Sequence, residues 1–140
     1  MKDVAGWKRM NDPVIAEFRA RRGQTSRSFP VILLTTTGRR SGQPRLTPLN
    51  FSIDGDRLVA IASKGGSPHH PAWFLNLQAD PIVTIEHAGE TFRARASVAA
   101  EPERTRLYDA QAHLMPFFDG YRKRVTARQI PVVVFERSAD

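Results

Sequence analysis

The chain has 140 residues, no cysteine and a formal net charge of +7, with 21 Lys or Arg residues against 14 Asp or Glu. The length predicts one domain with its own core. The lack of cysteine excludes disulfides, thiolate catalysis and cysteine-ligated metal centres. The basic residues are mostly arginine, which indicates either an anionic partner or guanidinium groups scattered over a solvated surface.

No apolar run approaches the ~20 residues that a membrane-spanning helix needs, and the first residues lack the apolar core of a signal peptide. We therefore expect a cytoplasmic protein. Residues 1–140 are expected to form a single domain, with an N-terminal helix and loop over 1–29 and the main fold over 30–140.

The first predicted helix begins with Asp12 as its cap and Pro13 at its first position. Its apolar stripe and basic last turn are both short: Val14, Ile15 and Phe18, then Arg19, Arg21 and Arg22 before Gly23 and the polar loop 24–30. A basic amphipathic helix either docks on the core or contacts an anionic membrane surface. The short stripe favours docking on the core.

Three strands are expected next. Residues 31–36 are β-branched and nearly all apolar, which is typical of a strand buried on both faces. Residues 44–53 and 57–63 flank Asp54-Gly55, a strong hairpin signal. A two-residue loop there would pair Phe51 with Leu58 and Leu49 with Ala60.

A second hairpin is predicted to join residues 82–87 to 90–99 through Ala88-Gly89. Its register would place Ile85 opposite Phe92 and Val83 opposite Ala94. The alternation of residue types assigns one face to the core and the other to water: Phe92, Ala94, Ala96 and Val98 against Thr91, Arg93, Arg95 and Ser97. Residues 131–136 form the last expected strand.

Two further helices are expected, over residues 71–79 and about 102–114. The second carries an apolar stripe made of Leu107, Gln111 and Leu114, with Tyr108 and Met115 alongside. Residues 115–121 (MPFFDGY) are expected to form an aromatic-rich loop. Six or so short strands, mostly antiparallel, with helices at the periphery predict a mainly β, α+β fold in the form of a small barrel. Barrel closure would account for the strands buried on both faces.

The segment TTTGRRSGQPR, residues 35–45, has the means to bind an anion. Gly38 and Gly42 permit positive φ, so successive N–H groups can line one concavity. Hydroxyl and guanidinium donors surround them: Thr37, Ser41, Arg39, Arg40 and Arg45. The alternative is a solvated polar turn. Pairing of 44–53 with 57–63 would bring Lys64 to the same end of the sheet, which favours anion binding.

The remaining candidate side chains are less specific. His69 and His70 are adjacent and lack the spacing of a metal site, so no metal is expected. No G-x-S-x-G motif is present, so a hydrolytic triad is poorly supported. The aromatic side chains of Trp73, Phe74 and the 115–121 segment either pack in the core or line a pocket for a flat ring.

Four segments together resemble the deazaflavin-dependent nitroreductase family, whose members are small split β-barrels that use reduced coenzyme F420. These segments are LLTTTGRRSGQPR, SKGG, PAWFLNLQADP and IPVVV, and the resemblance covers residues 30–135. It implies that F420, a long polyanion, is bound at its phosphate and tail by Arg39, Arg40, Ser41 and Arg45, with charge added by Lys64. It also implies that the backbone of Ile61, Ala62 and Ser63 faces the ring system, and that Trp73, Leu75 and Asn76 complete the groove.

The resemblance further implies hydride transfer to a flat, electron-poor acceptor such as a quinone, enone or nitro compound. Tyr121 and Ser63 are the candidate proton donors. The candidate substrate pocket consists of Asn50, Phe117, Phe118 and Tyr121. Phe118 and Asn50 stand where nitroimidazole-reducing members have tyrosine, and Arg40 stands where lysine is frequent. Loss of two hydroxyls argues against activity on nitroimidazoles.

Other functions stay open at this point. A split barrel that handles FMN or haem is one, although a single FMN phosphate needs fewer cations than this chain offers. A nucleic-acid-binding module is another, for which Arg93 and Arg95 would matter, but no recognised motif supports it. The sequence is compatible with a monomer or a homodimer.

Overall fold

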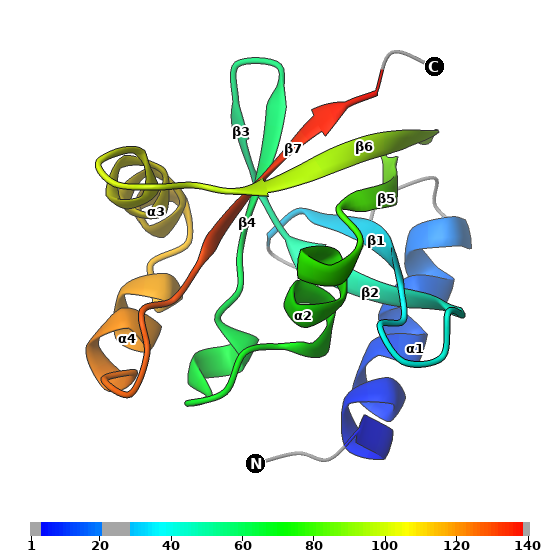
Figure 1. Ribbon diagram of the computed structural model, residues 1–140, viewed down its shortest axis with the longest axis horizontal. Coiled ribbons are helices and arrows are strands. Elements are labelled where there is room, and N and C mark those ends of the chain that lie inside the picture. Colours follow the sequence, from blue (N-terminus) through cyan, green and yellow to red (C-terminus); the bar gives the residue numbers. More distant parts are fainter. Residues whose placement is uncertain (1–3, 21–28, 139–140) are drawn as a thin grey trace.

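The computed structural model describes residues 4–20 and 29–138, and its strands form a single antiparallel sheet (Figure 1). The order of the strands in the sheet is β2-β1-β5-β6-β7-β4-β3. In chain order they are β1 (Val31–Thr37), β2 (Pro44–Asn50), β3 (Ser52–Asp54), β4 (Arg57–Ile61), β5 (Ile82–His87), β6 (Glu90–Val98) and β7 (Val132–Arg137).

The described helices are α1 (Val4–Ala20), α2 (Ala72–Ala79), α3 (Glu103–Leu114) and α4 (Phe117–Arg124), with a short 3-10 turn, η1 (Lys64–Gly66). None of the helices within the described ranges combines the length and apolar character needed to cross a membrane.

The sheet curls because the predicted strand 44–53 breaks at Phe51 into two strands. β2 pairs with β1, whereas β3 pairs with β4, so the two pieces form opposite edges of the sheet. Asn50 and Ser52 are separated by one residue and therefore by only about 7 Å. A sheet whose two edges are joined by so short a link has to curve back on itself. The split-barrel prediction is confirmed, with seven strands in place of about six.

The first hairpin has a different register from the one predicted. Asp54 pairs with Arg57 and Ile53 with Leu58, so the loop residues are Gly55 and Asp56, and Phe51 does not lie opposite Leu58. The reason is the turn type. Gly55 has φ +65 at the first central position, where a type II′ turn requires glycine. Asp54 is left in the strand.

The second hairpin has the predicted register, with Ile85 opposite Phe92 and Val83 opposite Ala94. Ala94 and Ala96 are buried as expected. Val98 was also predicted to face the core, but it is 48% exposed, because it is the last residue of β6 and lies at its end.

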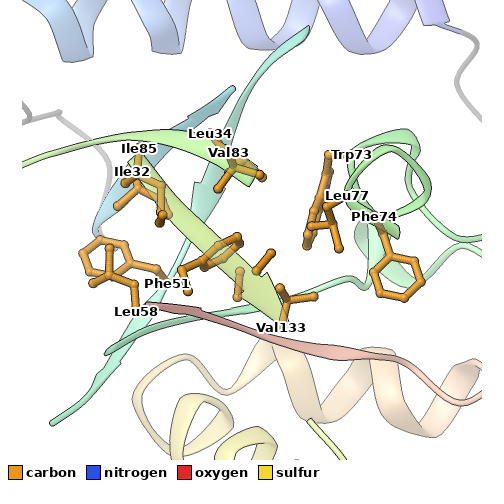
Figure 2. Close-up of a cluster of buried hydrophobic side chains, with 14 of the residues drawn as sticks. Ile32, Leu34, Phe51, Leu58, Trp73, Phe74, Leu77, Val83, Ile85 and Val133 are labelled. Atoms are coloured by element: carbon orange, nitrogen blue, oxygen red, sulfur yellow. The ribbon is translucent and has the colours of Figure 1, made fainter. Parts of the chain in front are cut away.

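One apolar cluster fills the inside of the curl (Figure 2). It joins β-strand side chains with Trp73, Phe74 and Leu77 of α2, of which Trp73 and Leu77 lie nearest the strand side chains in Figure 2. A second cluster lies on the other face of β4 and β7, where Val59 and Val134 pack against α3 and α4. The last strand is thus buried on both faces because helices cover its outside, which barrel closure alone would not achieve.

Helix α1 begins earlier than predicted, at Val4, and contains Pro13 in its interior. Proline removes a backbone donor and crowds the preceding turn, but the residues before it include good helix formers such as Lys8 and Met10. Val14 and Phe18 are buried, which agrees with docking on the core. The predicted roles of Arg21, Arg22, Gly23 and residues 24–28 lie outside the described residues.

The predicted loop 115–121 is mostly helical, because it provides the first turns of α4. Pro116 occupies the position before the helix, and the basic last turn suits the helix dipole. Gly120 costs about 1 kcal/mol relative to alanine. Two features of Phe118 offset that cost. Its side chain is buried, and its carbonyl accepts a 2.7 Å hydrogen bond from the Tyr108 hydroxyl. In α3, Leu114 was predicted to be buried but is 61% exposed, since it lies in the final turn.

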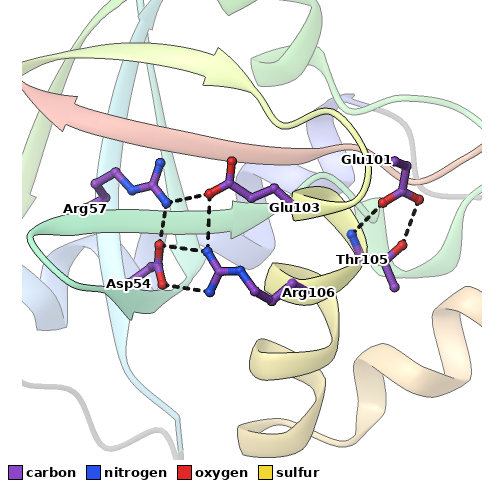
Figure 3. A network of polar contacts seen from close by, with 6 residues as sticks. All are labelled: Asp54, Arg57, Glu101, Glu103, Thr105 and Arg106. Carbon is purple, nitrogen blue, oxygen red and sulfur yellow. Dashed lines mark hydrogen bonds and ion pairs between the residues drawn. The ribbon is translucent and has the colours of Figure 1, made fainter.

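A network of two carboxylates and two guanidinium groups ties the β3–β4 hairpin to α3 (Figure 3). Asp54 accepts hydrogen bonds from Arg57 and Arg106, and Glu103 accepts from both as well. Hydrogen bonds from Arg106 and then Arg57 lower the pKa of Asp54 to about 2. The same two partners, Arg57 first, lower the pKa of Glu103.

We expect the network to make the fold sensitive to acid. A carboxyl with a depressed pKa in the folded state contributes stability above its unfolded pKa of 3.8, and that stability is lost as the pH falls toward 2. The variant Asp54→Asn should therefore be less stable than the wild type at pH 6, with a difference that shrinks between pH 4 and pH 2. Urea unfolding of both proteins over this range measures it. A difference that stays constant with pH would contradict this assignment.

Candidate functional site

The loop between β1 and β2 is a compact turn closed by its own backbone. Gly38 N–H donates to the Gln43 carbonyl at 2.8 Å, and Gly42 N–H donates to the Gly38 carbonyl at 2.8 Å. Gly42 has φ +70, which favours glycine. A Cβ on Gly38 would lie 2.6 Å from Ser41 Oγ and 3.2 Å from the Gln43 carbonyl oxygen, so a larger residue there would displace the Ser41 side chain. Both glycines singled out in the sequence therefore suit the shape of this loop, Gly42 through its backbone conformation and Gly38 through the space it leaves for Ser41.

Helix α2 holds the start of this loop through Asn76. The Oδ1 atom of Asn76 accepts from the backbone N–H of Arg39 at 3.2 Å and from its guanidinium at 3.1 Å. The amide nitrogen of Asn76 donates to Thr36 Oγ1 at 3.2 Å. Asn76 is 3% exposed, so it is a buried anchor. Two predicted cofactor residues, Arg39 and Asn76, thus lie together, and Thr36 is an additional member that the sequence did not single out.

Ser41 holds the later part of the loop, residues 43–45, through hydrogen bonds to its hydroxyl oxygen. Its hydroxyl oxygen accepts from the Gln43 N–H and from the Arg45 guanidinium, both at 3.1 Å. Arg39, Arg40 and Arg45 are all exposed. Within the described residues, no carboxylate forms an ion pair with any of the three.

Other arginines of the protein differ in this respect. Arg57, Arg106 and Arg122 each pair with two carboxylates. The loop of residues 38–45 therefore presents guanidinium groups whose charge nothing in the described chain neutralises, as an anion-binding surface requires.

A second basic loop follows β4. Lys64, Gly65 and Gly66 have consecutive positive φ values of 48, 62 and 84. A Cβ on Gly66 would lie 3.1 Å from both Tyr121 Cδ1 and Arg124 Nη2, so α4 packs directly against this turn. Arg124 also lies over the Tyr121 ring, with its Cζ 5.4 Å from the ring centroid. The loop at Lys64 is therefore bordered by a tyrosine and a further arginine.

Arg128, which the sequence did not single out, lies behind this second loop. Its Nη1 donates to the Ala62 carbonyl at 3.1 Å and lies 3.1 Å from His70 Nδ1. Its Nη2 donates to the carbonyls of Ser63 and Ser67, each at 3.0 Å. No motif in the segment around Arg128 signals this contact, because the residues it joins lie about sixty positions earlier in the chain.

We predicted that pairing of residues 44–53 with 57–63 would bring Lys64 to the same end of the sheet as Arg45, and this pairing is wrong for residues 44–50. β4 pairs with β3 and β7, not with β2, so no ladder joins the two basic loops. Helix α2 links them instead. Asn76 on that helix holds Arg39, and the chain after Lys64 leads into the helix at Pro71.

The backbone of Ile61, Ala62 and Ser63 was predicted to face a cofactor ring. The Ala62 N–H is instead committed to the sheet, donating to the Pro131 carbonyl at 2.9 Å because the β4–β7 ladder continues past Ile61. The carbonyls of Ala62 and Ser63 accept from Arg128. Ser63 is 6% exposed. Ile61 and Ser63 stay predictions, whereas the Ala62 amide is not available as a donor.

Trp73 and Leu75 were predicted to complete the groove. Trp73 is buried in the inner cluster, edge-on to Phe74 with ring centroids 6.4 Å apart (Figure 2). Leu75 is half-buried and packs against the same cluster. Trp73 contributes mainly to core packing, and Leu75 is the more accessible of the two.

The predicted substrate residues form a chain of contacts at the start of α4. Phe117 packs edge-on against Phe29 at 5.4 Å, and Asn50 donates to the adjacent Pro30 carbonyl at 3.2 Å. Phe118 is 4% exposed and belongs to the outer core cluster. Tyr121 is half-buried. Phe117 and Tyr121 are therefore accessible, while Phe118 supports them from behind.

Two other features of the molecule lie apart from these residues. A hollow beside α1 and the β5–β6 turn is lined by Phe18, Arg19, Glu86 and neighbouring residues, and it includes none of the predicted site. Among the described residues no group of His, Asp or Glu could hold a metal ion. The basic loops suit an anion better than the hollow, because the charge of Arg19 in the hollow is already paired with Glu86, and Glu90 is paired with Arg137.

Comparison with known proteins points to a single family. A family model described as F420H(2)-dependent quinone reductase matches residues 7–137. The F420H(2)-dependent quinone reductase Rv1261c of Mycobacterium tuberculosis is 39% identical over 111 residues, which cover 77% of this chain and 74% of that protein.

Two solved structures are similar in fold. An F420-H2 dependent reductase (FDR-A) has a TM-score of 0.71 and 31% identity, covering 76% of this chain and 94% of its own. A protein described as a domain-swapped dimer has a TM-score of 0.73 and 29% identity, covering 96% and 100%.

Proposed function

Because this chain belongs to the family of F420H(2)-dependent quinone reductases, we infer that it is an oxidoreductase that uses reduced coenzyme F420 to reduce a quinone. The predicted deazaflavin-dependent family and the predicted cofactor are thereby confirmed. Of the three acceptor classes considered from the sequence, the quinone is the one that fits the family. The family match over residues 7–137 is the observation that carries this conclusion.

The donor set of the 38–45 loop suits a long polyanion. Arg39 is held by Asn76, and Arg45 is held by Ser41. No carboxylate of the described residues competes for either guanidinium group. We propose that Arg39, Arg40, Ser41 and Arg45 bind the phosphate and the acidic tail, and that Lys64 contributes charge from the second loop. A charge-assisted hydrogen bond of this kind is worth ~1.5–3 kcal/mol.

Bound F420H2 supplies a hydride, and the protein supplies orientation, exclusion of water and a proton. Quinone reduction needs a proton at the oxygen. We propose that Tyr121, which borders the Lys64 loop, donates it from its hydroxyl, with the buried Ser63 as the alternative donor. Phe117 and Asn50 would line the acceptor site, with Phe118 packed behind them.

The partners and the location of the protein are also proposals. We propose a small-molecule acceptor, a cytoplasmic location and no nucleic-acid partner. Contact of α1 with an anionic membrane would have to use groups other than Val14 and Phe18, since both are buried. A monomer and a homodimer are both compatible with the proposal, and a homodimer is supported by the similar protein that is described as a domain-swapped dimer.

Titration with F420 and with FMN, followed by fluorescence, tests the proposed function. We expect F420 to bind with a Kd in the micromolar range or below and more tightly than FMN, because two basic loops serve a polyanion better than a single phosphate. F420H2 oxidation should then be faster with a quinone than with an enone or nitroaromatic. Equal or tighter binding of FMN would overturn the proposal.

A further inference from the structure

We propose that Arg128 is a positioning residue for the reaction: its guanidinium fixes the conformation of the Lys64 loop, residues 62–70, and thereby sets the affinity for the anionic cofactor. The loop-fixing role stands on contacts within the protein. Its link to cofactor affinity rests on the proposed function.

The contacts of Arg128 span both ends of the loop. The carbonyls of Ala62 and Ser63 lie where the chain leaves β4, whereas Ser67 and His70 lie where it turns toward α2. The three carbonyl oxygens and His70 Nδ1 all lie 3.0–3.1 Å from the two terminal nitrogens of one guanidinium group. The group therefore bridges the entry and the exit of the Lys64 turn.

The turn needs such a clamp because its backbone is unusual. Lys64 has φ +48, a conformation that a residue with a Cβ rarely adopts, and two further left-handed residues follow it. Within the turn the backbone bonds reach only from Gly66 to Ser63 and from Ser67 to Lys64, each at 3.1 Å. Residues in this region persist when the surroundings hold them in place, and Arg128 supplies that support from outside the turn.

The forked shape of arginine matters as much as its charge. A planar guanidinium directs donors at several acceptors in one plane, whereas a lysine ammonium is a compact point charge on a flexible stem. Arg128 forms no ion pair with a carboxylate of the described residues. Its Nε is buried without a hydrogen-bond partner within that same part of the chain. The side chain is thus committed to the loop.

His70 fits the same arrangement. Its ring is tilted against Phe74, with centroids 4.9 Å apart, and its Nδ1 faces Arg128. Burial, and then the charge of Arg128, lower the pKa of His70, so the ring is neutral near pH 7 and its Nδ1 can accept the hydrogen bond. The clamp is therefore complete under ordinary conditions.

The test compares Arg128→Lys, which keeps the charge but loses the fork, with Arg128→Met, which loses both. Hydrogen exchange of the cofactor-free protein should show the amides of Gly66 and Ser67 exchanging at least tenfold faster in Arg128→Lys. The hairpin β5–β6 should be unchanged. The F420 Kd should rise about tenfold in the same variant, with an unchanged KM for the quinone. Arg95→Lys, an exposed arginine on β6, is the matched control and should resemble the wild type.

His70→Phe serves as a milder second variant. It removes one acceptor, keeps an aromatic ring beside Phe74, and should speed exchange in the same loop by a smaller factor.

Three outcomes distinguish the positioning role of Arg128 from its alternatives. If Arg128→Lys matches the wild type while Arg128→Met loses affinity, charge alone is responsible and the positioning role is wrong. If exchange accelerates equally in β5–β6, the effect is general destabilisation and the proposal is likewise overturned. If the wild type fails to bind F420 but Arg128→Lys still loosens residues 62–70, the loop-fixing role is supported and the proposed function is what fails.

Discussion

Replacing Arg39 and Arg45 together by alanine is expected to raise the Kd for F420 by about 10²-fold. Each guanidinium provides a charge-assisted contact worth ~1.5–3 kcal/mol, and ~1.4 kcal/mol corresponds to a factor of ten. Because both side chains are exposed, we expect the sum to fall at the lower end of that range. The affinity should also decline with added salt less steeply in the variant than in the wild type. Fluorescence titration at two ionic strengths measures both effects.

The matched control removes the same charge elsewhere. Arg93 and Arg95 project from the exposed face of β6, distant in sequence from both basic loops. The variant Arg93→Ala/Arg95→Ala should therefore bind F420 nearly as well as the wild type, and neither double variant should alter the quinone KM. A similar loss of affinity in both variants would mean that net charge, rather than the 38–45 loop, attracts the cofactor.

Replacing Phe135 by alanine should destabilise the fold by about 3–5 kcal/mol, the usual cost of truncating a buried phenylalanine. Phe135 is 2% exposed and lies in the middle of the sheet, with Leu58 on one side and Ala96 on the other. The substitution would leave a cavity in the inner cluster. No other residue of β7 is aromatic, so no second ring on that strand can fill it. Urea unfolding at pH 7, followed by far-UV circular dichroism, measures the change in the free energy of unfolding.

The control for this variant lies in the same row of the sheet. Ile53 pairs with Leu58 but belongs to the edge strand β3 and is 61% exposed. Ile53→Ala should cost about 0.5 kcal/mol or less, as exposed substitutions generally do. Equal costs at the two positions would show that the inner cluster does not carry the stability assigned to it.

The sequence was sufficient for features that depend on short-range signals. The β5–β6 hairpin followed from strict alternation around Ala88-Gly89, and its register was correct to the residue. The α2 helix followed from its flanking prolines. In both cases the residues that decide the structure are close neighbours in the chain, so a local pattern contains the needed information.

Features set by distant contacts could not be predicted in this way. Phe51 interrupts a strand-like run only because its two halves pair with different partners. The 115–121 segment becomes helical with support from Tyr108 and from packing on the outer cluster. Arg128 reaches a loop about sixty residues earlier, and no spacing rule connects them.

The same distinction between local patterns and distant contacts applies to the candidate site. The Gly38–Arg45 loop could be identified because its glycines and arginines are contiguous. The buried Asn76 that fixes it was named only through family resemblance, and Thr36 was not named in that role at all. Residues that act directly on a ligand tend to have distinctive chemistry, whereas residues that hold them in place resemble any other core or loop residue.

The single-residue link at Phe51 also has a bearing on solubility. Exposed sheet edges carry unpaired backbone groups that can recruit strands from other molecules. In this protein the two edge strands are consecutive in the chain and turn back toward one another, and β3 is only three residues long. A proteolytic cut between Asn50 and Ser52 would leave every ladder intact yet free the two edges to separate. We therefore expect a protein cut at this position to aggregate more readily than the intact chain, which light scattering of the two forms would measure.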